Sequence, residues 1–400
     1  MTQVTSHDAY FTQLSDALRT ANLFRPTMLL DLDRLDRNID RVAASIPEAL
    51  DLRVVAKSLP SPQLLDHVTA RAQTNRLMVF HQPFLNQLAA TQPDKDLLIG
   101  KPFPVGAAAR FYDHHIANQF DPSKQLQWLV DTPARLHDYA ALATQRELQM
   151  NITIEIDVGL HRGGVSDPAQ TAAMLDVIAA TPNLTFTGLM GYDAHVAKVP
   201  TAFGMQKREF TSVLDRYQAH LSVLQNKLTP DEYAALTLNA AGSPTFRRYQ
   251  DIDFVTELAA GSALVKPLDF DLPDLADLEP AIFIGTPVLK ASGPTQIPAL
   301  NGLGNLWAKF DRNRARTFFI YGGYWKAHPV SPTGLSNNSL YGRSTNQEVL
   351  NGSTDVQLAP EDFVFLRPTQ SEFVMLQFGD LAIVRGGQVV DYWPTLAQGS

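Results

Sequence analysis

Lys57 is the residue whose type and position most strongly suggest chemistry, because it directly follows the apolar run Val54-Val55-Ala56. A lysine placed at the end of such a run loses hydration, which favours the neutral amine over the ammonium form. A neutral amine can condense with an aldehyde to form a covalent link. The alternative is a lysine that extends its charged end into water at the rim of a fold.

A glycine-rich turn further along the chain carries His161 and Arg162. Gly159, Gly163 and Gly164 allow the backbone of this turn to bend close to a ligand. The guanidinium of Arg162 could then donate hydrogen bonds to an anionic oxygen. The alternative is a structural turn with an exposed arginine.

Two turns of small residues could hold a phosphate. One spans residues 239–245 and the other is Gly261-Ser262. Backbone N–H groups and hydroxyls in such turns form concave sites for anions. The candidate phosphate ligands are Gly242, Ser243, Thr245, Gly261 and Ser262.

Short apolar runs must position these residues. Each is four to eight residues long and rich in β-branched or large apolar side chains, as expected for a strand buried on both faces. Helical patterns fill the gaps, so strand and helix alternate eight times, which predicts a parallel (βα)8 barrel of the TIM type. The runs end at Lys57, His81, Lys101, Asp131, Gly159, Asp193, Gly242 and Gly261.

In such a barrel the active-site residues gather at the C-terminal ends of the strands, and phosphate often binds after the last two strands. The two small-residue turns follow the seventh and eighth expected strands. The strand ends carry Lys57, His81, Lys101, Asp131, Asp157, Tyr192, Asp193 and His195.

Before the first barrel strand, residues 32–46 have apolar positions three and four apart, which predicts an amphipathic helix.

The alternation of strand and helix patterns ends at about residue 265. Beyond residue 266, β-like runs dominate and helical periodicity is nearly absent. We therefore predict a barrel domain over 27–265 and a mainly antiparallel β-domain over 266–400, joined by 1–26.

Composition excludes several classes of protein. The formal net charge of −8 argues against a nucleic-acid binder, whose surface is basic. The absence of cysteine excludes disulfides, thiolate metal sites and a cysteine nucleophile. No secretory signal and no run of about 18 apolar residues occur, so we expect a cytoplasmic protein that does not span a membrane.

The ordered segments LDRLDRNIDRVAASI, VVAKSL, IEIDVGLHRGGV, GYDAHV, LNAAGSPTF and TELAAGS resemble the fold-type III enzymes that use pyridoxal 5'-phosphate (PLP). Their N-terminal barrel is of the alanine-racemase type. The most similar branch holds D-threonine aldolase, 3-hydroxy-D-aspartate aldolase and D-serine dehydratase. The resemblance covers residues 25–265 and continues more weakly to Trp393-Pro394.

The resemblance implies a role for each candidate residue. Lys57 would hold PLP as a Schiff base and, once freed by a substrate amine, would act as a base at the substrate Cα. The phosphate would be held by Ser243, Gly261 and Ser262, with Gly242 and Thr245 in the same turn. The residues expected beside the cofactor ring or substrate are His81, Arg162, Tyr192 and His195.

Departures from the family pattern affect the metal. The aldolase and dehydratase branch binds a divalent metal through a His-x-Cys or His-x-Asp pair, and Thr369 and Ser371 stand in its place. Neutral hydroxyls are poor zinc ligands, so we predict no metal there. Glu348, Glu372 and His328 could still form a weak site. Two tyrosines frequent in the family are replaced by Ala263 and Phe270.

The resemblance favours a PLP-dependent lyase, an aldolase or dehydratase that acts on a β-hydroxy D-amino acid. Without the metal, His195, Tyr324 or His328 would serve as acid or base. An amino-acid racemase is the first alternative, with Lys57 and either Tyr324 or Tyr341 as its two bases. A PLP carrier without turnover and a PLP-free barrel, such as a sugar-phosphate enzyme, are the others. Family members of this size usually form head-to-tail homodimers.

Overall fold

The computed structural model describes residues 6–115, 119–296 and 311–399, and its chain divides into two compact units. The barrel unit comprises Asn38–Leu264, Leu272–Asp277 and Leu396–Ser400, and the sheet unit comprises Met1–Arg37, Val265–Asp271 and Leu278–Thr395. This division differs from the predicted domain of 27–265, since residues 27–37 belong to the sheet unit.

Eight parallel strands close into a barrel, which confirms the predicted fold. Most barrel strands are buried along nearly their whole length, as their apolar sequences require. The observed strands end one to three residues before the predicted ends, so the polar residues lie in the turns that follow them. The barrel strands are β2 (Asp51–Val55), β3 (Arg76–Val79), β4 (Asp96–Ile99), β5 (Leu126–Val130), β6 (Met150–Ile156), β7 (Leu184–Gly191), β8 (Thr237–Ala240) and β9 (Glu257–Ala260).

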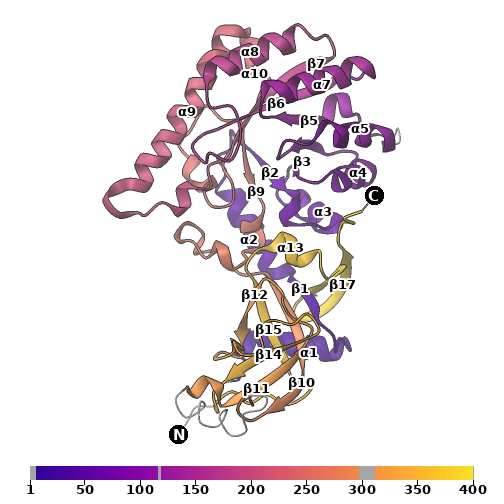
Figure 1. Cartoon of the computed structure of the whole chain (residues 1–400), viewed down its shortest axis with the longest axis vertical. Helices are drawn as coiled ribbons and strands as arrows, with labels where there is room; N and C mark the ends of the chain where they lie inside the picture. The colour runs from indigo at the N-terminus through magenta and orange to yellow at the C-terminus, as the bar shows by residue number, and fades with distance from the viewer. Residues whose placement is uncertain (1–5, 116–118, 297–310, 400) are drawn as a thin grey trace. The chain divides into compact units, whose positions relative to one another are not determined.

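Helices surround the barrel (Figure 1). Six of them begin with proline in the first turn, where its missing N–H costs no hydrogen bond. The helices of this unit are α3 (Pro62–Arg71), α4 (Gln82–Thr91), α5 (Val105–His114), α6 (Pro122–Gln125), α7 (Pro133–Gln145), α8 (Pro168–Ala179), α9 (Met205–Lys227), α10 (Pro230–Ala234) and α11 (Ser262–Val265), while α2 (Leu32–Ala44) is divided between the units after Arg37.

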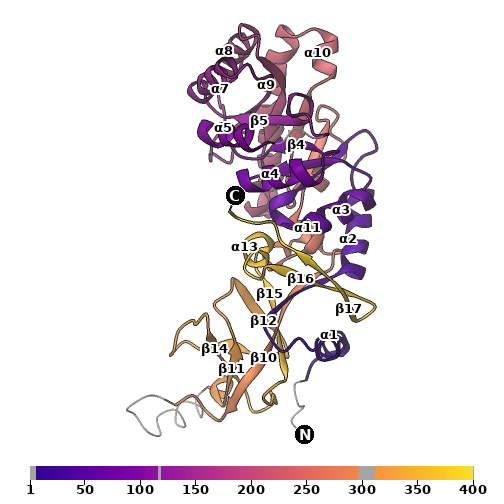
Figure 2. The same cartoon turned by 90° about the vertical axis from the view of Figure 1, so that its right-hand side faces the viewer.

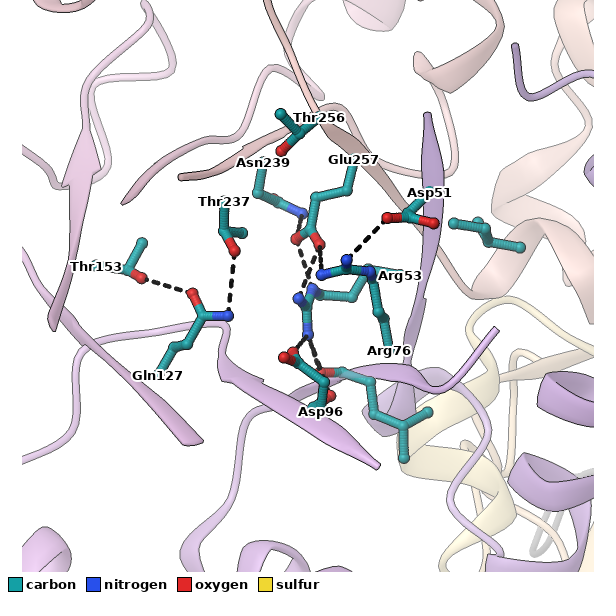
Figure 3. Close-up of polar contacts among 12 residues, drawn as sticks. Asp51, Arg53, Arg76, Asp96, Gln127, Thr153, Thr237, Asn239, Thr256 and Glu257 are labelled. Carbon is teal, nitrogen blue, oxygen red and sulfur yellow. Dashed lines mark hydrogen bonds and ion pairs between the residues drawn. The ribbon is translucent and has the colours of Figure 1, made fainter. Parts of the chain in front are cut away.

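A polar network fills the barrel interior near the N-terminal ends of the strands (Figure 3). Arg53 of β2 is fully buried and donates to both carboxylate oxygens of Glu257 on β9, at 2.5 and 2.7 Å. Arg53 also donates to Asp96, and Asn239 donates to Glu257. Burial alone would lower the pKa of Arg53, but the charges of Glu257 and Asp96 more than offset this effect and raise it. The network therefore ties β2, β4, β8 and β9 together through matched charges.

Among the described residues, the sheet unit has nine strands and is mainly antiparallel, as predicted, whereas the strands β1 and β16 pair in parallel. Helix α1 (Ala9–Thr20) packs Phe11, Leu14 and Leu18 against this sheet (Figure 2). The strands are β1 (Thr27–Asp31), β10 (Ile282–Ser292), β11 (Arg316–Tyr321), β12 (Ala327–Ser331), β13 (Ser336–Asn337), β14 (Gln347–Gly352), β15 (Phe363–Pro368), β16 (Asp380–Arg385) and β17 (Gln388–Pro394).

Part of the run 372–387, which the sequence suggested to be β-like, forms a short helix, α13 (Ser371–Met375). Phe373, Val374 and Met375 are tolerated in helices, and burying Val374 and Met375 outweighs the strand preference of valine. Among the described residues, no helix has the length and apolar character needed to cross a membrane.

Candidate active site

Lys57 lies in the 3-10 turn η1 (Ala56–Ser58), which directly follows β2. Its Nζ atom lies 4.4 Å from the centre of the Phe80 ring. Phe80 follows β3, the neighbouring strand of the barrel. The lysine amine is thus held beside an aromatic ring at the C-terminal ends of two adjacent strands.

The turn that carries Lys57 is in direct contact with the turn after β9. Ser262 Oγ donates to Ser58 Oγ over 2.9 Å. A Cβ atom at Gly261 would lie 2.8 Å from the carbonyl oxygen of Val55, so only glycine allows the two turns to approach this closely. The amine of Lys57 and the hydroxyl of Ser262 therefore belong to adjacent, hydrogen-bonded turns.

Ser243 joins the turns after β8 and β9. Its Oγ atom accepts hydrogen bonds from the N–H groups of Gly261 at 3.0 Å and Ala263 at 3.1 Å. Gly242 lies against Tyr192, because a Cβ atom there would be 2.5 Å from Cε2 of that ring. Residues 242–245 and 261–263, which we call the phosphate turns, are thus linked to each other.

A buried carboxyl group supports the first phosphate turn. Asp193 is fully buried and accepts hydrogen bonds from Thr245 Oγ1 at 2.6 Å and from the Tyr249 hydroxyl at 2.9 Å. Burial raises the pKa of Asp193, although these two hydrogen bonds act in the opposite direction. The Thr245 hydroxyl, predicted to bind phosphate, therefore donates to Asp193 in this structure.

Arg162 is carried by a closed loop, residues 157–165, after β6. The N–H of Val165 donates to the Glu155 carbonyl at 2.8 Å, and the N–H of Asp157 donates to the Val165 carbonyl at 3.0 Å. Within the loop, the Asp157 carboxylate accepts the N–H groups of Gly159 and His161. Burial acts to raise the pKa of Asp157, but these hydrogen bonds together hold it below its usual range.

The loop directs Arg162 toward Tyr192. The guanidinium carbon of Arg162 lies 5.0 Å from the centre of the Tyr192 ring, within the range of a cation–π contact. Because Tyr192 also contacts Gly242, the Arg162 loop is connected with the phosphate turns. The structure thus brings together Lys57, Arg162, Tyr192, Gly242, Ser243, Gly261 and Ser262.

Glu155, which the sequence did not single out, lies beneath this loop. It is partly buried in β6, and burial raises its pKa to about 7, with Asp131 adding to the effect and Arg162 opposing it. Only the alternation of β6 could have indicated it, since Glu155 is two residues beyond Thr153, which points into the barrel. Phe80 was also missed, because its contact with Lys57 depends on the pairing of β2 with β3.

His195 is paired with helix α9. Its Nε2 atom lies 3.1 Å from Glu209 Oε1, whereas its buried Nδ1 atom has no hydrogen-bond partner among the described residues. An imidazole with one nitrogen bonded to a carboxylate is fixed in orientation, and the second nitrogen of His195 is buried.

His81 is bonded to a distant segment of its own unit. Its Nε2 atom lies 3.1 Å from the carbonyl oxygen of Gln398, and its ring packs against Phe84. The same segment is held by Gln87, whose side-chain amide bonds both the carbonyl and the N–H of Ala397. The hydrogen bond of His81 is therefore to the chain itself, and Phe80 rather than His81 contacts Lys57.

Tyr324 belongs to the sheet unit. It has a φ of +57°, and its N–H donates to Glu348 Oε2 at 2.7 Å. Arg343 is paired with Glu348 and lies over the Tyr324 ring. The side chain of Tyr324 remains 59% exposed, so it is presented to solvent from a firmly held turn.

At the predicted position of metal loss, Thr369 bonds the backbone of Lys326 and the buried Ser371 hydroxyl has no partner within the described part of the chain. Of the three groups that could have formed a weak site, Glu348 is held by Arg343 and Tyr324. The described residues include no cluster of three His, Asp or Glu side chains suited to a metal. The loss of the metal stays a prediction.

A family model described as alanine racemase, N-terminal domain, matches residues 30–266, more than half of the chain. The chain belongs to this family. Members of the alanine racemase N-terminal domain family are fold-type III, PLP-dependent enzymes that include aldolases, dehydratases and racemases, so the cofactor of this chain is PLP.

Two curated relatives have similar sequences. D-threonine aldolase of Arthrobacter sp. is 26% identical over 221 residues, which cover 50% of this chain and 56% of the relative. 3-Hydroxy-D-aspartate aldolase of Paracoccus denitrificans is 23% identical over 173 residues, or 41% of this chain and 43% of the relative. The chain thus aligns with about half the length of each.

Solved structures resemble most of the chain. D-threonine aldolase from Filomicrobium marinum has a TM-score of 0.72 at 18% identity and covers 93% of this chain and 95% of its own. Alanine racemase from Bacillus anthracis has a TM-score of 0.66 at 16% identity and covers 93% and 98%. At these identities the likeness establishes the fold.

The residues at the barrel mouth fit PLP. An amine, the hydroxyls of two serines in adjacent glycine-containing turns, and a guanidinium are groups that can bind an aldehyde, a phosphate and a phenolic oxygen. The close approach at Gly261 places the lysine turn beside a phosphate turn.

Proposed function

We propose that this chain is a PLP-dependent lyase that cleaves or dehydrates a β-hydroxy D-amino acid. The observation that carries the proposal is the hydrogen bond between Ser262 and Ser58, which joins a phosphate turn to the turn of Lys57. Two aldolase relatives favour a lyase over other reactions of the family.

In this proposal each residue has a separate task. Lys57 holds PLP and later removes or returns a proton at one face of the substrate Cα. Arg162 donates to the anionic ring oxygen, with Tyr192 beside it, and Ser243, Gly242, Gly261 and Ser262 hold the phosphate. When bound, PLP supplies a conjugated ring that withdraws electrons from a bond at Cα.

The second catalytic group acts on the β-hydroxyl. We assign it to His195, because Glu209 fixes its orientation and its Nδ1 atom has no partner within the described chain. The proposed reaction needs no divalent metal, since Thr369 and Ser371 replace the family's ligands. Activity that survives exhaustive dialysis against a chelator supports this assignment, and activity restored only by added divalent cations contradicts it.

The reaction is tested with D-threonine and D-3-hydroxyaspartate, taken from the names of the two aldolase relatives. Purified PLP-loaded protein is incubated with each compound and with its L-enantiomer as the control. Glycine plus an aldehyde indicates an aldolase, and a keto acid plus ammonia indicates a dehydratase. The lyase proposal would be refuted if every D-substrate gave neither pair of products.

An amino-acid racemase is the second candidate, favoured by the exposed Tyr324 on its strained turn. In this reading Tyr324 serves a partner copy in a homodimer as the base opposite Lys57. Deuterated water separates the two candidates, because racemisation labels Cα and conserves mass. Lys57 labelled by PLP without any turnover would instead indicate a PLP carrier. A homodimer and a cytoplasmic location remain predictions, the first testable by light scattering.

A further inference from the structure

We propose that Glu155 is a positioning residue that holds the Arg162 guanidinium in place at the barrel mouth through its carboxyl group. The inference deepens the proposed function and rests on it, because Arg162 is the expected partner of the PLP ring oxygen.

The orientation of Glu155 follows from its strand. Thr153 donates to Gln127 of β5, which in turn donates to Thr237 of β8, so these three side chains lie inside the barrel (Figure 3). Side chains two residues apart on a strand point to the same side. Glu155 therefore also points into the barrel, one layer closer to the C-terminal ends of the strands.

The loop after β6 brings Gly163, the residue next to Arg162, close to this carboxyl group. Val165 is hydrogen-bonded back to the Glu155 carbonyl, so the loop of residues 157–165 closes onto β6. The Glu155 Oε2 atom lies 3.9 Å from the position of a Cβ atom at Gly163, the residue next to Arg162. The carboxyl group is thus close to the backbone that carries the guanidinium.

Four charged groups influence Glu155: Asp131, Arg135, Asp157 and Arg162. Asp131 and Arg135 are already paired with each other at 2.7 Å, and Asp157 is bonded to His161 within the loop. Arg162, which stacks near Tyr192, is therefore the cation whose placement most depends on the charge of Glu155. Because the pKa of Glu155 lies near 7, this charge changes with pH in the neutral range.

The experiment measures PLP binding by its visible absorbance across the neutral pH range in four proteins: wild type, Glu155→Gln, Arg162→Gln and the double variant. Above neutral pH we expect Glu155→Gln to bind PLP about tenfold more weakly, because the attraction between the Glu155 carboxylate and the Arg162 guanidinium is lost. Below about pH 6 the wild type and Glu155→Gln should converge, because Glu155 is then neutral in both. Glu48→Gln, which alters an exposed carboxylate in the same unit, is the matched control.

If Glu155 acts through Arg162, then Glu155→Gln has no further effect in the Arg162→Gln background. A loss of affinity of the same size in both backgrounds, or one that does not vary with pH, would overturn the inference. Arg162→Gln changes an exposed loop residue and is expected to fold even if Glu155→Gln does not. If Glu155→Gln does not fold, the wild type and Arg162→Gln still decide the question. A pH dependence of PLP affinity that is present in the wild type and absent from Arg162→Gln supports the inference, and the same pH dependence in both proteins refutes it. No PLP band in the wild type would instead refute the proposed function.

Discussion

Replacing Arg53 by methionine is expected to destabilise the barrel unit by about 4 kcal/mol, since removing one partner of a buried ion pair typically costs about 3–5 kcal/mol. Arg53 and Glu257 have side chains only 0% and 1% exposed, so the stranded carboxylate cannot recover its hydration. The substitution also removes the hydrogen bonds from Arg53 to Asp96 and to the Leu77 carbonyl. Asn239 and Arg76 remain bonded to Glu257 and limit the loss.

A double-mutant cycle separates the ion pair from packing. We expect Arg53→Met combined with Glu257→Met to lie within about 1 kcal/mol of the wild type, because an apolar pair of similar volume carries no unpaired charge. Urea denaturation followed by circular dichroism measures each free energy of unfolding. A loss below about 1 kcal/mol for Arg53→Met, or additive losses in the double variant, would refute this reasoning.

Three further predictions concern the site and its support. Burial raises the pKa of Glu155 from 4.5 to about 7, so its contribution to stability is full below about pH 4.5 and is lost as the pH rises through 7. One pKa unit corresponds to about 1.36 kcal/mol, so the wild type should lose about 3 kcal/mol of unfolding free energy as the pH rises, and Glu155→Gln should not. If the unfolding free energies of both proteins, measured in urea, change with pH in parallel, this prediction is contradicted. Thr245→Val removes a hydrogen-bond donor to the buried Asp193 and should lower the free energy of urea unfolding by about 1–3 kcal/mol and weaken PLP binding. Thr245→Ser should restore both stability and PLP binding. An unchanged PLP affinity in Thr245→Val would contradict a role for this turn. Gln87→Leu removes two hydrogen bonds to Ala397, at about 1 kcal/mol each, and should expose the segment 396–398 to proteolysis; an unchanged cleavage rate would show that Gln87 does not hold it.

The barrel was predictable because its strands carry a local signal. Runs such as those ending at His81 and Lys101 are apolar on both faces, and this pattern indicates a strand covered by helices. The turns after the last two strands were predictable as well, because their glycines and serines stand at positions set by the strand count. The structure places these turns directly after β8 and β9, and their binding of phosphate stays a prediction.

Long-range contacts were not predictable from local patterns. Thr245 donates to Asp193, 52 residues earlier, and His81 contacts Gln398, 317 residues later, so neither pairing leaves a periodic signature. The inward direction of Glu155 depends on the register of β6 within the closed barrel, since a shift by one residue would reverse it. The secondary structure of the segment around Val374 was also not predictable, because a short apolar run suits a strand and a helix alike.

The central claim is that Lys57 is the residue that binds PLP covalently. It is tested most directly by loading the purified protein with PLP, reducing it with borohydride and locating the modified lysine by peptide mass spectrometry. The account predicts a pyridoxyl group on Lys57 and no stable modification in Lys57→Ala, with Lys101→Ala modified like the wild type. A pyridoxyl group on another lysine, or none at all, would contradict it.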